Sequence, residues 1–109
     1  MIEFILPVSG VIIQGITQLH SGMDITCIEG SPVIAVHSGY GQGKRDYNMG
    51  NVFTLTSDDG IMTSYSHLKR FVSDGSYEVG DVIGYCGNTG KMTNGPHLHF
   101  ESNQTFRFQ

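Results

Sequence analysis

Three short clusters in the sequence contain side chains of the types that bind a divalent metal ion. They are His20-Ser21-Gly22-Met23-Asp24, Tyr65-Ser66-His67-Leu68 and Pro96-His97-Leu98-His99-Phe100-Glu101. Two neutral imidazoles and one carboxylate form a ligand set that leaves the fourth tetrahedral position of zinc open, as in catalytic rather than structural zinc sites. Together the clusters predict one zinc ion per chain, and an enzyme rather than a scaffold.

Strand geometry explains the alternation in the third cluster. Residues two apart in a strand project to the same side, so His97 and His99 are expected to point together while Leu98 and Phe100 enter an apolar layer. A His-x-His pair alone is weak support for a metal site, because it also occurs as a surface pair. The prediction therefore depends on the other clusters.

The first cluster adds a histidine and a carboxylate. Ser21 and Gly22 permit a turn through which His20 and Asp24 can converge on one point. Separately, an exposed histidine and a turn aspartate are the ordinary explanations, but their occurrence with the histidines of the other clusters favours a shared metal site. The remaining histidine, His37, has no such pattern around it, and we expect it to lie at the surface or to have a hydrogen-bonded structural role.

The elements that position these clusters are predicted to be strands. Residues 51–57 and 61–67 both alternate between apolar and polar side chains, and Asp58-Asp59-Gly60 between them is a turn signal, which predicts a hairpin ending at His67. Tyr65 has the same parity as His67, so it is expected either to line the groove or to be a half-buried strand tyrosine. Further short β-rich runs are expected at residues 23–28, 32–36 and 81–86, with at most one helical turn at residues 68–72.

Residues 40–51 are rich in glycine. Residues 40–51 hold or adjoin Gly39, Gly41, Gly43 and Gly50, and are predicted to form a mobile loop beside the site. Residues 87–90, with the sequence Gly-Asn-Thr-Gly, are interpreted as a turn that sets the groove edge.

Length and charge limit the class of protein. At 109 residues the chain is predicted to form one domain, 1–109, and to act as a monomer. Its net charge of −4 gives no basic footprint for nucleic acid, which is therefore excluded as a partner. No stretch approaches the roughly 18 apolar residues of a membrane span.

Two features bear on location and redox state. The first seven residues lack a basic leader, so the domain is expected to have lost its leader by processing, to be released on lysis, or to be carried in a particle such as a phage. Cys27 and Cys86 lie 59 positions apart without a C-x-x-C pattern, and buried free thiols are the favoured expectation, with a disulfide as the alternative.

The sequence resembles the lysostaphin-type, or LytM-domain, zinc endopeptidases, which cut peptide cross-links in bacterial peptidoglycan. The resemblance covers most of the chain and follows the family's order. Besides the three clusters it includes Gly30-Ser31-Pro32-Val33-Ile34-Ala35, Gly50-Asn51-Val52, Val79-Gly80-Asp81-Val82-Ile83-Gly84 and Gly87-Asn88-Thr89-Gly90.

The resemblance implies a role for each clustered residue. His20, Asp24 and His99 would be the metal ligands, and His67 and His97 would be the paired catalytic histidines. The implied fold is a compact, antiparallel, mostly β domain with little helix, whose central sheet holds the metal in a groove. The implied action is hydrolysis of peptidoglycan peptides at the bacterial cell wall, outside the cytoplasm, by a metal-activated water.

The chain departs from the family pattern at both ends. The segment before His20 is brief, so one groove wall is expected to be shorter than in the family, and the tail at residues 105–108 is expected to supply a final strand or an attachment edge. Glu101 shares the strand face of His97 and His99, and we expect it either to hold a metal-bound imidazole or to face solvent.

Three other functions are compatible with parts of the pattern. The first is a zinc-stabilised module of a phage particle or envelope assembly that binds the cell wall without cutting it. The second is a phosphocarrier, which would leave Asp24 and the histidine set without a purpose. The third is a peptidase of soluble proteins, which turnover of casein would distinguish.

Overall fold

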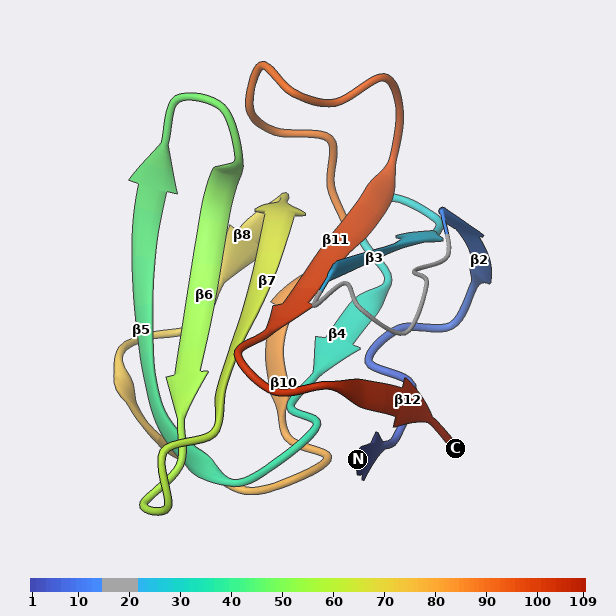
Figure 1. Cartoon of the computed structure of the whole chain (residues 1–109). Coiled ribbons are helices and arrows are strands. Elements are labelled where there is room, and N and C mark those ends of the chain that lie inside the picture. Colours follow the sequence, from blue (N-terminus) through green and yellow to red (C-terminus); the bar gives the residue numbers. More distant parts are fainter. Residues whose placement is uncertain (15–21) are drawn as a thin grey trace.

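The chain folds into β-strands joined by turns (Figure 1). The computed structural model describes residues 1–14 and 22–109, and these contain twelve strands and no helix. Seven strands form one antiparallel sheet, in agreement with the predicted fold class. In spatial order they are β2 (Val11–Gln14), β3 (Gly22–Thr26), β11 (His97–Ser102), β7 (Met62–Leu68), β6 (Gly50–Thr56), β5 (Gly39–Asp46) and β9 (Gly75–Tyr77).

Two smaller sheets complete the fold. One is antiparallel and has the order β4 (Pro32–Ile34), β10 (Val82–Tyr85), β8 (Arg70–Phe71); the other pairs β1 (Ile2–Phe4) in parallel with β12 (Phe106–Phe108). The expected final strand is thus confirmed, and Arg107 Nε donates a hydrogen bond to Glu3 Oε2 at 2.8 Å across this pair. The permitted helical turn is replaced by β8.

The hydrophobic core lies against one face of the large sheet. Leu98 and Phe100 of β11 are fully buried there, as their alternation with the histidines predicted. Burying side chains of this size contributes roughly 1.5–3 kcal/mol each. The opposite face of β11 remains available for His97 and His99. Other buried members of the core are Phe4, Val8, Ile25, Val33, Ala35, Val36, Phe53, Leu55, Tyr65, Leu68, Ile83 and Phe106.

The predicted hairpin is formed by β6 and β7. Its turn is closed by hydrogen bonds from Ser57 N to Ile61 O (2.8 Å) and from Gly60 N to Ser57 O (3.1 Å). Near the other end the register shifts, because Asn51 pairs with Leu68 while Phe53 pairs with Tyr65. β7 therefore carries one extra residue, a β-bulge.

The prediction of a mobile loop at residues 40–51 is wrong. Most of this segment is β5 and the start of β6, paired in continuous register from Tyr40 with Thr56 to Asp46 with Gly50. A Cβ atom at Gly41 would lie 2.3 Å from the Phe53 ring, and one at Gly43 would lie 2.1 Å from the Phe71 ring. These glycines leave room for aromatic rings on the strand and do not signal mobility.

The favoured expectation of free thiols is also wrong. Cys27 and Cys86 form a disulfide, with a Cα–Cα distance of 6.2 Å. Each cysteine follows the last residue of a strand, Cys27 after β3 and Cys86 after β10. The 59 positions that separate them in the sequence could not reveal this proximity, because it arises from packing one sheet on another.

No helix in residues 1–14 and 22–109 has the length and apolar character that crossing a membrane requires.

Candidate active site

Asp24, His97 and His99 are brought together by the pairing of β3 with β11. Cross-strand pairing places Asp24 opposite His99, and Asp24 Oδ1 lies 2.6 Å from His99 Nδ1. The same oxygen is 3.8 Å from His97 Nε2. The predicted alternation therefore puts both histidines of β11 beside the carboxylate, on the face away from the core.

His67 reaches the same place because of the bulge in β7. Strict alternation would put His67 on the face of Tyr65, which is fully buried in the core. Instead, His67 has φ +64°, the one positive φ outside glycine in the described residues. Its ring turns to the other face, with its centroid 4.8 Å from that of His97 and 6.4 Å from that of His99. A bulge that redirects a side chain in this way is common beside functional sites.

Tyr65 consequently does not line the site, and it is fully rather than half buried. Its hydroxyl oxygen accepts hydrogen bonds from Val36 N (3.2 Å) and Thr63 Oγ1 (2.9 Å). Burial raises the pKa of Tyr65 to about 12, so this hydroxyl stays protonated. Its role is to satisfy polar groups inside the core.

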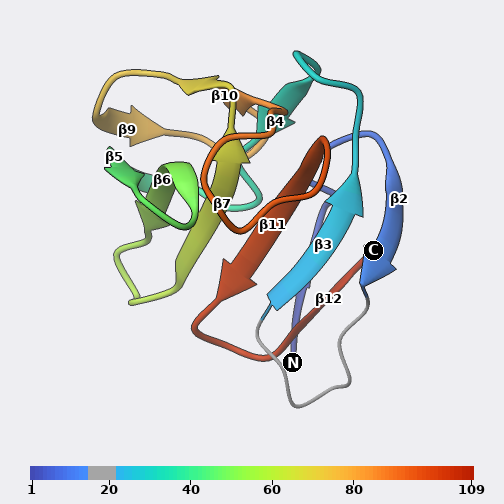
Figure 2. The ribbon, with the colours of Figure 1, turned by 90° about the horizontal axis from the view of Figure 1, so that it is seen from above.

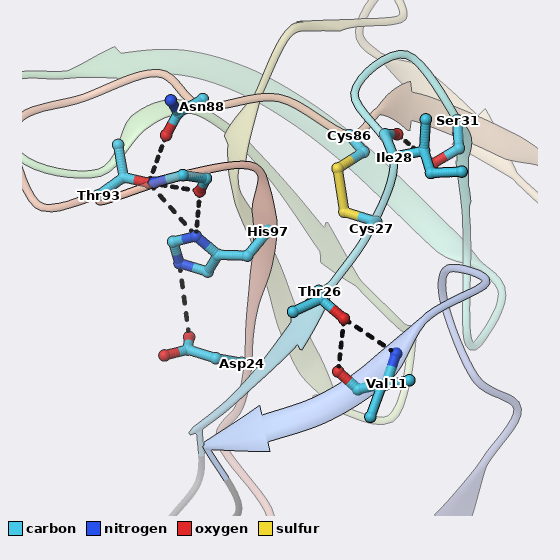
Figure 3. The surroundings of a disulfide bond; sticks show 11 residues. Val11, Asp24, Thr26, Cys27, Ile28, Ser31, Cys86, Asn88, Thr93 and His97 are labelled. Carbon is cyan, nitrogen blue, oxygen red and sulfur yellow. Dashed lines mark hydrogen bonds and ion pairs between the residues drawn. A yellow bond between two sulfur atoms is a disulfide. The ribbon is translucent and has the colours of Figure 1, made fainter.

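The Nδ1 atoms of His67 and His97 are both held by backbone carbonyls. His67 Nδ1 lies 2.7 Å from Thr89 O, and His97 Nδ1 lies 2.9 Å from Gly95 O. Because a carbonyl oxygen only accepts, each Nδ1 carries the hydrogen, and Nε2 of the neutral ring is an acceptor. For His97, Figure 3 shows this Nε2 directed toward Asp24.

Burial lowers the pKa of His67 below its usual range. The His67 side chain is 2% exposed, which disfavours the charged ring, and the neighbouring His97 and His99 act in the same direction. The hydrogen bond to Thr89 O and the charge of Asp24 oppose this shift. The outcome is a histidine that is neutral at pH 7, with a free lone pair on Nε2.

Thr89 holds both His67 and the strands around the bulge. Its Oγ1 donates to Leu68 O at 2.7 Å and accepts from Asn51 N at 3.0 Å, which bridges β7 and β6. The turn predicted at residues 87–90 is thus part of the support of the site. Sequence analysis missed the role of the Thr89 carbonyl, because a backbone oxygen leaves no trace in residue type.

The segment between β10 and β11 lies over this part of the large sheet (Figure 2). It lines a pocket of about 650 Å³ together with β3, a volume in the usual range for ligand sites. The pocket is bounded by Asp24, Thr26, Lys91, Met92, Thr93, Asn94, Gly95, Pro96 and His97.

Two of the three expected metal ligands, Asp24 and His99, lie side by side. Asp24 Oδ1 and His99 Nδ1 lie in hydrogen-bonding contact, and a carboxylate oxygen and an imidazole nitrogen are donors that suit zinc. The third, His20, lies outside the described residues, and within residues 1–14 and 22–109 there is no group of three potential ligands arranged around one point. Glu101 is exposed and its Oε2 lies 3.4 Å from His99 Nε2, so both expectations for this residue, exposure to solvent and contact with the imidazole, agree with the geometry.

His37 has the structural role that was predicted for it. Its Nε2 lies 2.9 Å from Thr63 Oγ1, its Nδ1 lies 2.9 Å from Ser38 O, and its ring centroid lies 6.0 Å from that of Phe4. It takes no part in the cluster around Asp24.

Comparison with known proteins places these features in a family. The model of peptidase family M23 matches residues 18–107. The DD-carboxypeptidase/endopeptidase Mpg of Neisseria meningitidis serogroup B is 39% identical over 87 residues, which are 78% of this chain and 20% of that protein. The chain thus spans about a fifth of the length of the curated relatives it matches.

Solved structures show the same fold. A putative M23 peptidase from Pseudomonas aeruginosa aligns with a TM-score of 0.81 at 24% identity, over 91% of this chain and 44% of that one. The antimicrobial peptidase lysostaphin from Staphylococcus simulans aligns with a TM-score of 0.73 at 29% identity, over 88% of this chain and 43% of that one. Together with the family match over residues 18–107, these likenesses establish that the chain belongs to peptidase family M23, of the LytM or lysostaphin type.

Proposed function

We propose that this chain is a zinc-dependent endopeptidase that hydrolyses peptide cross-links or bridges of bacterial peptidoglycan. The observation that carries the proposal is the convergence of two imidazoles, His67 and His97, beside the Asp24–His99 pair. The names of the relatives, a carboxypeptidase/endopeptidase and an antimicrobial peptidase, agree with a peptide substrate.

Asp24 and His99 would hold the metal, with His20 as the third ligand. Zinc in such a site lowers the pKa of a bound water toward ~7 and polarises a carbonyl group. Glu101, near the other nitrogen of His99, would fix the orientation of that ring.

His67 and His97 would move the protons of the reaction. Each ring keeps its Nδ1–H on a backbone carbonyl, so each can take up a proton on Nε2 and release it without rotating. The lowered pKa of His67 leaves its Nε2 ready to accept a proton at neutral pH. A protonated Nε2 on either ring can donate to the developing oxyanion or to the leaving amine.

The pocket beside His97 would take the peptide on one side of the scissile bond. Its walls combine polar side chains, such as Thr26 and Asn94, with the apolar Met92 and Pro96. Such a lining suits a peptide, because the polar residues can form hydrogen bonds with its backbone and the apolar residues can pack against its aliphatic side chains.

Digestion of purified cell walls tests the proposal. Zinc-loaded protein is incubated with sacculi of several wall types, and the released muropeptides are identified by mass spectrometry. We expect cleavage at a peptide bond, its loss with a chelator, its return with added zinc, and no comparable turnover of casein. Protein that binds the sacculi with zinc present, but releases nothing, would instead be a non-catalytic wall-binding module.

A further inference from the structure

The Cys27–Cys86 disulfide joins the two segments that build the site. Cys27 follows Asp24 by three residues, and Cys86 precedes Thr89 by three residues. On one side of the bond is the strand that carries the carboxylate, and on the other is the segment whose carbonyls hold the two imidazoles. Figure 3 shows the bond between these segments, near His97 and Asp24.

The two segments are anchored to different parts of the fold. β3 is hydrogen-bonded to β11 through five residue pairs, which fixes Asp24 within the large sheet. Residues 86–96 belong to no strand, and their pairing with the sheet is a single bridge between Gly87 and His97. Hydrogen bonds of Thr89, Lys91 and Met92 attach this segment to β6, β7 and the turn between β5 and β6, and the disulfide attaches it to the end of β3.

The orientation of both imidazoles depends on this segment outside the strands. Thr89 O receives the Nδ1–H of His67, Gly95 O receives that of His97, and Gly87 O receives the backbone N–H of His97. A shift of the segment would therefore move the acceptors that aim both Nε2 atoms. Asp24 and His99 would stay in place, because both lie in paired strands.

We propose that the Cys27–Cys86 disulfide is a positioning element of the active site: it fixes the 86–96 segment so that its carbonyls orient His67 and His97 toward Asp24. The inference rests on the proposed peptidase function. The site then has two halves: a metal-binding half, which is built on strands, and a proton-transfer half, which is held through the disulfide. Loss of the bond should impair turnover and leave zinc binding intact.

The experiment compares wild type with the double variant Cys27→Ala/Cys86→Ala at a temperature well below the melting point of both. We expect roughly a tenfold to hundredfold fall in kcat, as for small misplacement of catalytic groups, with one zinc still bound per chain. We also expect the hydrogen-bonded imidazole Nδ1–H signals of His67 and His97 to weaken or disappear in proton NMR spectra. A variant with kcat within twofold of wild type and unchanged imidazole signals would overturn the proposal.

A control separates positioning from general stability. Leu55→Ala removes buried volume from β6, toward the turn end of the hairpin, and lowers stability by an amount comparable to the loss of a disulfide. This control should keep its kcat and its imidazole signals. If it lost both as the double variant does, the disulfide would act through stability alone.

A second double variant and the NMR signals separate failure to fold and failure of the proposed function from failure of the positioning role. Because Cys86 is fully buried, a double alanine variant that does not fold is replaced by Cys27→Ser/Cys86→Val, which fills that space. If wild type cleaves no peptide, the proposed function fails, and the NMR signals still decide the positioning role. Disulfides persist in oxidising compartments, so the same dependence would keep turnover low wherever these cysteines are reduced.

Discussion

Replacing Thr89 by valine tests the support of His67. The hydroxyl of Thr89 bridges the two strands at the bulge, donating to Leu68 O at 2.7 Å and accepting from Asn51 N at 3.0 Å. Valine keeps the shape of the side chain and removes both hydrogen bonds, whereas Thr89→Ser keeps both and removes only a methyl group. Comparing the two variants therefore measures the contribution of the hydroxyl group alone.

The expected magnitude follows from two lost hydrogen bonds. Each contributes about 0.5–1.5 kcal/mol net. Leu68 O still receives a hydrogen bond from Asn51 Nδ2 at 3.0 Å, so the loss of its hydrogen bond from Thr89 is partly compensated. We expect Thr89→Val to lower the free energy of unfolding by about 2 kcal/mol, or the Tm by roughly 10 °C, because a domain of this size loses about 4–8 °C per kcal/mol.

Urea and thermal unfolding, followed by circular dichroism, measure this loss in wild type and both variants. Turnover is measured alongside, and we expect it to fall in Thr89→Val, since the residue whose carbonyl holds His67 loses two of its attachments to the strands. If Thr89→Val and Thr89→Ser lower the free energy of unfolding by the same amount, the hydroxyl bridge contributes nothing to stability. If stability fell and turnover did not, Thr89 would not position His67.

Three further predictions concern pH and packing. Burial lowers the pKa of His67, so the unfolded chain binds more protons than the folded metal-free chain as the pH falls below about 6.5. The Tm of the metal-free protein should therefore drop between pH 7.5 and 5.5. The variant His67→Gln should show a smaller drop. Tyr65→Phe should cost about 1–3 kcal/mol in urea unfolding, since the Val36 N–H and a buried threonine hydroxyl lose their acceptor; a neutral result would indicate that water replaces it. Gly43→Ala should cost about 1–3 kcal/mol by overpacking against the Phe71 ring, and combining it with Phe71→Leu should recover part of that loss in a double-mutant cycle, whereas strictly additive losses would refute the clash.

The sequence predicted the parts of the site that depend on alternation. His97 and His99 share a face opposite Leu98 and Phe100 because side chains in any regular strand alternate, and this required no knowledge of neighbours. The same rule fails for His67, which joins the cluster only through a bulge with a positive φ. No residue type signals that bulge, because its geometry is imposed by the packing of the strands.

Long-range contacts explain the remaining differences. The disulfide depends on how the sheet containing β10 packs beside the sheet containing β3, and the spacing of two cysteines carries no information about that packing. The glycines of β5 are required by rings on other strands, although locally they look like a flexible loop. The carbonyls of Thr89 and Gly95 have no side-chain signature at all.

The division between metal ligands and proton-transfer residues is tested most directly by the zinc content and turnover of single alanine variants. Wild type should bind one zinc per chain. Asp24→Ala and His99→Ala should lose zinc and turnover together, whereas His67→Ala and His97→Ala should retain one zinc and lose turnover. Loss of zinc from His67→Ala or His97→Ala in step with activity, or full zinc content in Asp24→Ala, would contradict the arrangement proposed here.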